Sequence, residues 1–223
     1  MGSVPEYYVA LELTGSGECC GPGGWYAPRT QAVVRVTATG AALATISPPR
    51  PYGTFTVVSA AADNRTFVLA AQLLARLPLR CPPATRFFRL RIDPASVTAG
   101  EPARLEPLPI AEQPAGTEVS GLALSPDASR LAVTAGPMLG PALHLFALAT
   151  GAGRAWRETG VGPGLGPGAA RGSLSWAADG RTLALLADPG VQLLDTPRPG
   201  PACWPAAGSC WPPPTARIRT GAR

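Results

Sequence analysis

Three aspartates recur at one position of a repeated pattern: Asp63, Asp127 and Asp179. Carboxylates that recur in this way could line a channel and act there as ligands. Each of the three, however, stands between two apolar stretches and is followed directly by Asn, Ala or Gly. Aspartate accepts hydrogen bonds from the backbone of its own turn, and Asn and Gly tolerate positive φ at the next position. Because a functional site is usually built once whereas every repeat needs its turn, we interpret all three as structural turn residues.

The chain has one histidine, His144, which could serve as a general base. It stands in an alternating stretch, on one face with Phe146 and opposite Leu143 and Leu145. No serine or cysteine with a matched acid lies nearby, so we interpret it as a histidine packed within a strand. A zinc site is excluded, because the chain has no second histidine and no Cys-X-X-Cys pair. We therefore expect no catalytic residue, no metal and no cofactor.

Cys19, Cys20 and Cys81 fall in corresponding loops of successive repeats. A disulfide from Cys81 to Cys19 or to Cys20 requires the Cα atoms to come within about 6 Å of each other. Such a bond would indicate an oxidising compartment. The alternative, free thiols in the loops, stays open, because five cysteines in a chain of this length do not form a dense disulfide framework.

The elements that position these residues form a repeat of short alternating stretches. In each unit the first two stretches flank the aspartate turn and a third follows. Two of the three units with such a turn also show a fourth stretch. The opening of the chain matches the second half of such a unit. The predicted strands lie within 7–13, 32–40 and 41–46, then 56–71, 86–94 and 103–110, then 121–136, 143–151 and 153–158, and finally 172–188 and 191–196.

Four short antiparallel strands are the blade of a β-propeller. A single blade has two apolar faces and cannot cover both, so blades stack face to face. We therefore predict an all-β chain that forms a partial β-propeller of about three and a half four-stranded antiparallel blades. The residues expected in the core are Leu122, Leu124, Leu131 and Val133, with their counterparts Val57, Phe67, Leu69, Leu183 and Leu185.

The repeat units are longer than a regular blade, which has about 40–45 residues. The additional residues lie in loops. Two of them, 14–31 and 72–85, join the second strand of a unit to the third. A glycine-rich stretch at 162–168 lacks the lysine of a phosphate loop and contains prolines. We expect it to be a flexible connection between blades.

Two of the units resemble the blade pattern of TolB-like and WD-repeat-like propellers. The matching stretches are ALSPDASRLAV with LHLFALATGAGRAW, and SWAADGRTLALL with VQLLDT. The stretch PPRPYGTFTVVSAAADNRTFVLAAQ also resembles a set of actinobacterial propeller proteins. The resemblance covers residues 7–196, but no blade ends in Trp-Asp or begins with Gly-His, which disfavours true WD-repeat proteins.

The same resemblance implies a propeller that an N-terminal membrane anchor holds outside the cytoplasm. This chain shows neither such an anchor nor a signal peptide. It also has no apolar run of the about 20 residues that a membrane span needs. We therefore expect no membrane span in this chain.

Charge argues against a nucleic-acid partner. All 19 basic residues are arginine, and the net charge is +5. Four arginines and no acid lie in residues 197–223, which leaves 15 basic and 14 acidic residues in the rest of the chain. A nucleic-acid-binding protein needs a clustered basic face, and none is evident.

Function in a propeller resides in its loops, which the rigid blades display. We expect a non-catalytic binding or scaffold module whose loops 14–31 and 72–85 contact a protein or a small-molecule ligand on the loop rim. The alternative is part of a propeller enzyme of the lactonase or quinoprotein type. Such an enzyme would need inward-pointing acids or histidines from several blades.

Residues 197–223 differ in composition from residues 1–196, which we assign to an incomplete propeller domain. Prolines interrupt every candidate strand in this tail. Cys203-Trp204-Pro205 and Cys210-Trp211-Pro212 are one triplet whose codons, read one base earlier, encode Leu, Val or Met followed by Leu and Ala. We expect a change of reading frame, and hence a truncated product, with a tail that lacks regular structure. The alternative is a native proline-rich disordered tail.

Overall fold

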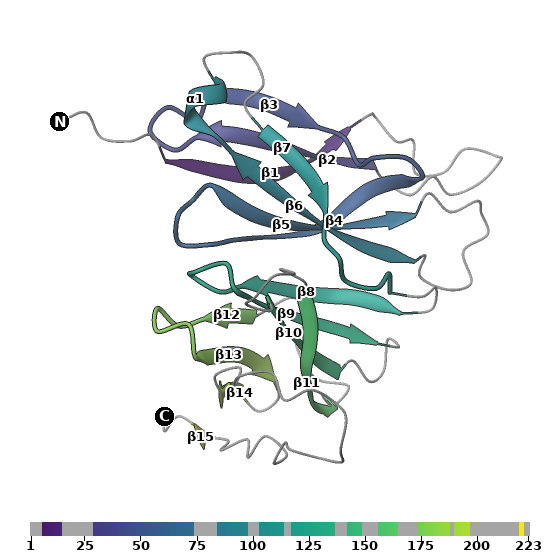
Figure 1. Cartoon of the computed structure of the whole chain (residues 1–223), viewed down its shortest axis with the longest axis vertical. Coiled ribbons are helices and arrows are strands. Elements are labelled where there is room, and N and C mark those ends of the chain that lie inside the picture. The colour runs from purple at the N-terminus through teal and green to yellow at the C-terminus, as the bar shows by residue number, and fades with distance from the viewer. Residues whose placement is uncertain are drawn as a thin grey trace.

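The computed structural model describes residues 6–14, 29–73, 84–97, 103–113, 117–136, 142–148, 156–164, 174–187, 190–196 and 219–220. In these residues the chain forms four antiparallel β-sheets that stack one on the next (Figure 1). Three of the sheets have four strands and the first has three. The prediction of an all-β, partial β-propeller is confirmed, and each sheet is one blade.

Strands follow one another in chain order from one edge of each blade to the other. Blade 1 contains β1 (Tyr7–Thr14), β2 (Arg29–Val36) and β3 (Ala42–Ile46). Blade 2 contains β4 (Tyr52–Ala60), β5 (Thr66–Leu73), β6 (Thr85–Ile92) and β7 (Ala103–Pro107). Blade 3 contains β8 (Glu118–Leu124), β9 (Arg130–Gly136), β10 (Ala142–Leu148) and β11 (Trp156–Gly164). Blade 4 contains β12 (Leu174–Trp176), β13 (Thr182–Ala187), β14 (Gly190–Asp195) and β15 (Arg219–Thr220).

One short helix interrupts the strands. Helix α1 (Pro94–Val97) follows β6 and is a single turn. Within the described parts of the chain, no helix is long and apolar enough to cross a membrane.

Each seam between neighbouring blades is filled by its own cluster of buried apolar side chains. Successive residues of a strand point to opposite faces, so a central strand supplies two seams. Leu131 and Val133 of β9 enter the seam with blade 2, whereas Ala132 enters the seam with blade 4. The largest members are Phe55, Phe67 and Phe88 between blades 1 and 2, Phe87, Leu131 and Phe146 between blades 2 and 3, and Leu143, Leu183 and Leu185 between blades 3 and 4.

Eight of the nine side chains expected in the core are at most 4% exposed. The exception is Val57, which is only partly buried. The pairing of β4 with β5 shifts register between Phe55 and Val57, so the strict alternation of faces is broken there. Phe55, which the predicted strand left out, is 1% exposed in the seam with blade 1.

Two segments are more regular than expected. Strand β11 continues to Gly164, so the predicted flexible connection is wrong for Gly162–Gly164. Among the described residues this strand pairs only with β10, and proline is tolerated at such an edge because its missing N–H is not needed by a further strand. In the tail, Arg219 pairs with Leu193 and Thr220 with Gln192. The sequence after Pro214 contains no further proline, so its backbone donors are intact.

Candidate functional site

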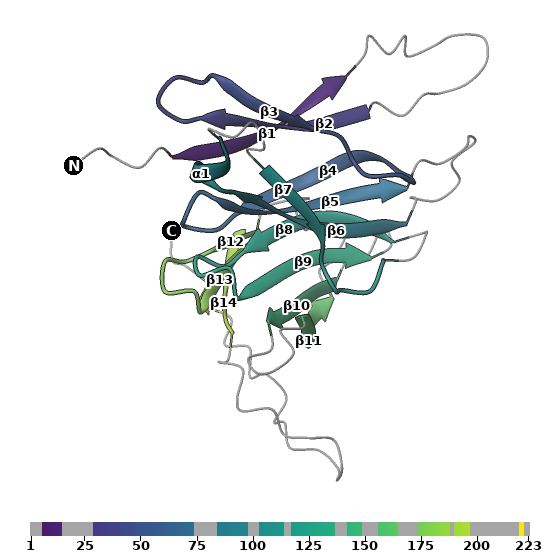
Figure 2. The ribbon, with the colours of Figure 1, turned by 45° about the horizontal axis from the view of Figure 1, so that its top comes forward.

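The first strands of blades 2, 3 and 4 lie next to one another, since β8 contacts both β4 and β12 (Figure 2). Their polar groups hold the blades together. The Leu124 N–H donates to Ser59 Oγ at 2.9 Å, which joins blade 3 to blade 2. The indole N–H of Trp176 donates to the Ala123 carbonyl at 3.0 Å, which joins blade 4 to blade 3. These strands therefore form a rigid frame.

Asp63 lies in the turn between β4 and β5. Its Oδ1 accepts the N–H of Arg65 at 2.9 Å and that of Thr66 at 2.8 Å. Its Oδ2 accepts the Thr66 hydroxyl at 2.7 Å. Asn64, which follows it, has a φ of 50°, a conformation that asparagine tolerates. Both carboxylate oxygens are thus engaged within their own turn.

Asp127 and Asp179 occupy the same position in blades 3 and 4. The Asp179 Oδ1 accepts the N–H groups of Arg181 and Thr182 at 2.8 and 3.0 Å. The Asp127 carboxylate accepts the Ser125 hydroxyl at 2.6 Å and the Ser129 hydroxyl at 2.7 Å. The residues that follow, Ala128 and Gly180, have φ values of 57° and 62°.

Hydrogen bonds lower the pKa of all three aspartates. Partial burial opposes ionisation of Asp63 and Asp127, but the donors of their turns outweigh it and hold each pKa below its ordinary value. For Asp179 the N–H groups of Thr182 and Arg181 are the main cause of the lowered pKa. The aspartates therefore act as charged turn caps in this geometry.

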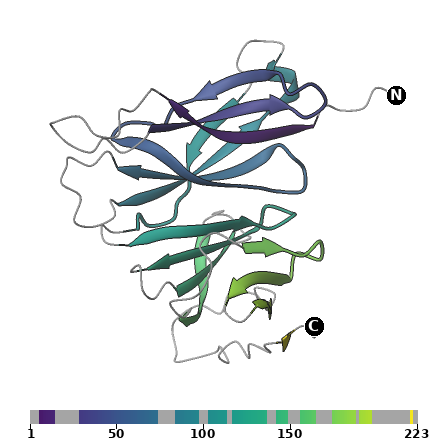
Figure 3. The ribbon, with the colours of Figure 1, turned by 180° about the vertical axis from the view of Figure 1, so that it is seen from behind.

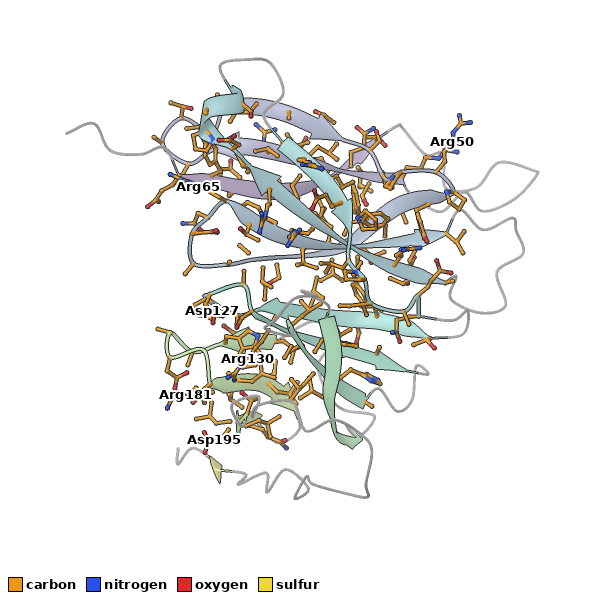
Figure 4. All side chains as sticks on the ribbon, in the orientation of Figure 1. Arg50, Arg65, Asp127, Arg130, Arg181 and Asp195 are labelled. Atoms are coloured by element: carbon orange, nitrogen blue, oxygen red, sulfur yellow. The ribbon has the colours of Figure 1, made fainter. Side chains whose placement is uncertain are left out.

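We call the edge of the stack that carries these three turns the turn rim. Adjacent turns touch there, because the Ala62 N–H donates to the Pro126 carbonyl at 3.0 Å. Figure 4 shows Arg65, Asp127, Arg130 and Arg181 along this edge, and Arg50 at the opposite edge. Across the described residues, no group of three or more histidine, cysteine or acidic side chains is placed to hold a metal ion.

The opposite edge, which we call the loop rim, carries the ends of the strands that the long loops connect. Tyr52 at the start of β4 pairs with Leu73 at the end of β5, and Gln72 pairs with Thr85 at the start of β6. Thr30 of blade 1 reaches the same edge, where its N–H donates to Thr54 Oγ1 at 3.1 Å.

A polar cluster of Tyr52, Arg86 and Glu112 lies on the loop rim. The Tyr52 hydroxyl donates to the Glu112 carboxylate. The Tyr52 ring also packs edge-on against Phe88, with ring centroids 5.5 Å apart. Burial and then the bond to Glu112 raise the pKa of Tyr52, while the nearby Arg86 partly opposes this shift. The cluster thus presents a neutral phenol, a carboxylate and a guanidinium at one place.

Two buried polar atoms beside this cluster have no hydrogen-bond partner, Arg86 Nε and Thr85 Oγ1. Buried polar groups are nearly always paired. The adjacent backbone is fully used, since Thr85 and Gln113 exchange two N–H to carbonyl bonds at 3.0 and 2.8 Å. Both atoms are buried, so a ligand cannot reach either of them in this structure.

The remaining predicted candidates contribute little to this site. Cys19, Cys20 and Cys81 lie outside the described residues, as do loop residues 15–28 and 74–83.

His144 lies half-buried in β10, opposite Val133 of β9 and Val161 of β11. The cluster of Tyr52, Arg86 and Glu112 was not predicted from the sequence, because Glu112 lies 60 residues from Tyr52 along the chain. Only the position of Arg86 at a loop end hinted at the site.

No protein-family model and no curated protein sequence matches the chain. The periplasmic gluconolactonase PpgL of Pseudomonas aeruginosa has a TM-score of 0.48 at 17% identity, covering 85% of this chain and 50% of its own. The β-propeller domain of Cps50 (Swd1) from Myceliophteria thermophila has a TM-score of 0.45 at 14% identity, covering 74% and 48%.

KlAtg21, in a complex with the coiled coil of AgAtg16, has a TM-score of 0.47 at 14% identity, covering 77% of this chain and 49% of its own. The chain therefore spans about half the length of these solved structures. Its propeller-like fold rests on the stack of four antiparallel sheets described above.

Proposed function

We propose that this chain is a non-catalytic binding module whose loop rim contacts a protein or a small-molecule ligand. The observation that carries the proposal is the cluster of Tyr52, Arg86 and Glu112 at the edge from which the two long loops emerge. Tyrosine and arginine are the side chains most enriched at binding hot spots.

The chemistry of the cluster supports a polar ligand that both donates and accepts hydrogen bonds. The Glu112 carboxylate accepts hydrogen bonds, and the Arg86 guanidinium beside Tyr52 carries several donors. The seams behind the cluster are filled by buried apolar side chains, so the loop rim is held by a rigid support. Little ordering of this part of the rim would then be needed on binding.

A capture experiment tests the proposal. The immobilised full chain is exposed to a soluble extract of the cells that produce it, and bound proteins and metabolites are quantified by mass spectrometry. Tyr52→Phe and Glu112→Gln should each lower the amount of the specifically captured species by about tenfold, as expected for a hot-spot contact. Arg181→Ala, on the turn rim, is the matched control and should leave capture unchanged.

Equal losses in the control and in the loop-rim variants would contradict the proposal, as would no capture above that of the denatured chain. A second assay addresses the enzyme alternative of the lactonase or quinoprotein type. Hydrolysis of a sugar lactone by the full chain, followed by titration of the released acid, should not exceed the buffer rate. A rate that disappears in Glu112→Gln would support the enzyme instead.

We propose further that residues 197–223 arise from a change of reading frame and that the continuous frame encodes more blades of a TolB-like propeller of the actinobacterial kind. The repeated Cys-Trp-Pro triplet supports this proposal. The pairing of Arg219–Thr220 with β14 favours a native tail instead. Resequencing of the locus should reveal further strand–turn–strand units in the shifted frame, and a prompt stop codon there would exclude the proposal.

A further inference from the structure

Four charged side chains lie together on the two outer strands of blade 2, the blade that stands between blade 1 and blade 3 (Figure 3). Strands β6 and β7 pair so that Arg89 lies opposite Glu106 and Arg91 lies opposite Arg104. Directly opposite residues share one face of a sheet, and so do alternate residues of one strand. We call these four residues the arginine cluster.

The alternation of the two strands shows which face carries the arginine cluster. Leu90 and Leu105, which alternate with its members, point into the seam with blade 1. The cluster therefore lies on the opposite face, from which Phe87 enters the seam with blade 3. Its side chains reach solvent, since that of Arg89 is 27% exposed and that of Arg104 is 82% exposed. Further blades added after blade 4 would not cover this place.

Within the cluster one carboxylate serves three guanidinium groups. Glu106 Oε2 accepts a hydrogen bond from Arg89 Nη2 at 2.8 Å, and Oε1 accepts one from Arg104 Nε at 2.9 Å. The bond from Arg89 is the main cause of the lowered pKa of Glu106, and the charges of Arg104 and Arg91 lower it further. Both carboxylate oxygens are engaged, and the four residues together carry a net charge of +2.

The position of Arg91 is unfavourable without a ligand. It is exposed and stands directly opposite Arg104, and like charges at such a cross-strand position destabilise a sheet. Among the described residues Arg91 forms no ion pair. The carboxylate of the nearby Asp93 is used by helix α1, where it accepts the Ala95 N–H and the Ser96 hydroxyl, each at 3.0 Å. Local rules of stability are broken in this way mainly at functional sites.

We propose that the arginine cluster binds a phosphate monoester dianion, at a site separate from the polar cluster on the loop rim. Guanidinium groups match the oxygens of a phosphate with paired N–H donors. A phosphate monoester carries about −1.5 to −2 charges at pH 7 and three acceptor oxygens. Its charge thus balances the excess on the cluster, whereas a carboxylate ligand would bring only one negative charge. The bound dianion would also remove the repulsion between Arg91 and Arg104.

Isothermal titration calorimetry of the full chain with methyl phosphate tests the charge of the ligand. Dimethyl phosphate is the matched comparison, because it keeps the phosphorus centre but carries a single negative charge. Methyl phosphate should bind at least about tenfold more tightly. A phosphoserine peptide and glycerol phosphate, titrated in the same way, distinguish a phosphorylated protein from a small metabolite as the source of the group. Equal affinities for methyl and dimethyl phosphate, or no binding of methyl phosphate, would overturn the proposal.

Arg91→Gln tests the residues assigned to the site. It should raise the dissociation constant of methyl phosphate at least about tenfold. Without phosphate, the variant should resist urea as well as the wild type or better, because the repulsion from Arg104 is gone. Arg181→Gln removes an exposed arginine of the turn rim and is the matched control, which should change neither quantity. Equal losses of affinity in the two variants would overturn the proposal, and so would a lower stability of Arg91→Gln.

Discussion

Leu131→Ala is expected to lower the free energy of unfolding by about 2–5 kcal/mol, the range for removing a buried leucine side chain. Leu131 is fully buried in the seam between blades 2 and 3, together with Phe87 and Phe146. On its own sheet it is paired with Leu124 on one side and Phe146 on the other. Sheets on both sides hold the surrounding atoms in place, so the resulting cavity can collapse only partly.

Urea denaturation followed by circular dichroism measures this effect. Leu193→Ala removes the same atoms from a side chain that is 38% exposed and is the matched control. In dilute protein, its cost should stay below about 1 kcal/mol, as for most substitutions of partly exposed residues. Equal costs for the two variants would show that Leu131 does not lie in a closed seam.

Asp63→Ala is expected to lower the free energy of unfolding by about 1–2 kcal/mol. This is the usual effect of removing a capping side chain that accepts hydrogen bonds from backbone donors. The substitution leaves the N–H groups of Arg65 and Thr66 without their acceptor. Thr66 is 9% exposed, so water reaches its donors poorly. Arg65→Ala is the control, because it keeps both N–H groups and the carboxylate and should change stability little.

The same turns make stability depend on pH. The folded-state pKa values of Asp63, Asp127 and Asp179 lie below their ordinary values. Their contribution is therefore complete above the unfolded-state pKa of about 4 and is lost as the pH falls through the lower folded-state values. Urea titrations at successive pH values should show stability falling below about pH 5, and falling less steeply in Asp63→Asn. Identical slopes would rule out this turn as a source of the acid sensitivity.

Local pattern predicted most of the fold because each strand and its turn are specified within a few residues. Alternating apolar residues located β5, β9 and β13, and the aspartates located the turns that precede them. The register shift between Phe55 and Val57 escaped prediction, since a bulge depends on how two strands pair. The extension of β11 to Gly164 was also not predicted. A strand can contain a proline at a sheet edge, but the sequence does not reveal that β11 lies at an edge.

The candidate site was predictable only as a region. The loops 14–31 and 72–85 led us to propose this edge as the functional one, and the polar cluster on the loop rim lies beside the strand ends that they join. The bond between Tyr52 and Glu112 could not be foreseen, because it joins β4 to a segment beyond β7. Such contacts depend on the tertiary fold and leave no periodic trace in the sequence.

Because each seam is self-contained, the fold can accommodate different numbers of blades. The main contacts between different blades all join neighbours, and each seam has its own apolar cluster. The two seams around blade 3 are also joined by separate hydrogen bonds, from Leu124 to Ser59 and from Trp176 to Ala123. A blade could therefore be duplicated or lost in evolution while every other seam stays as it is, which is how one architecture comes to exist with typically 4–8 blades.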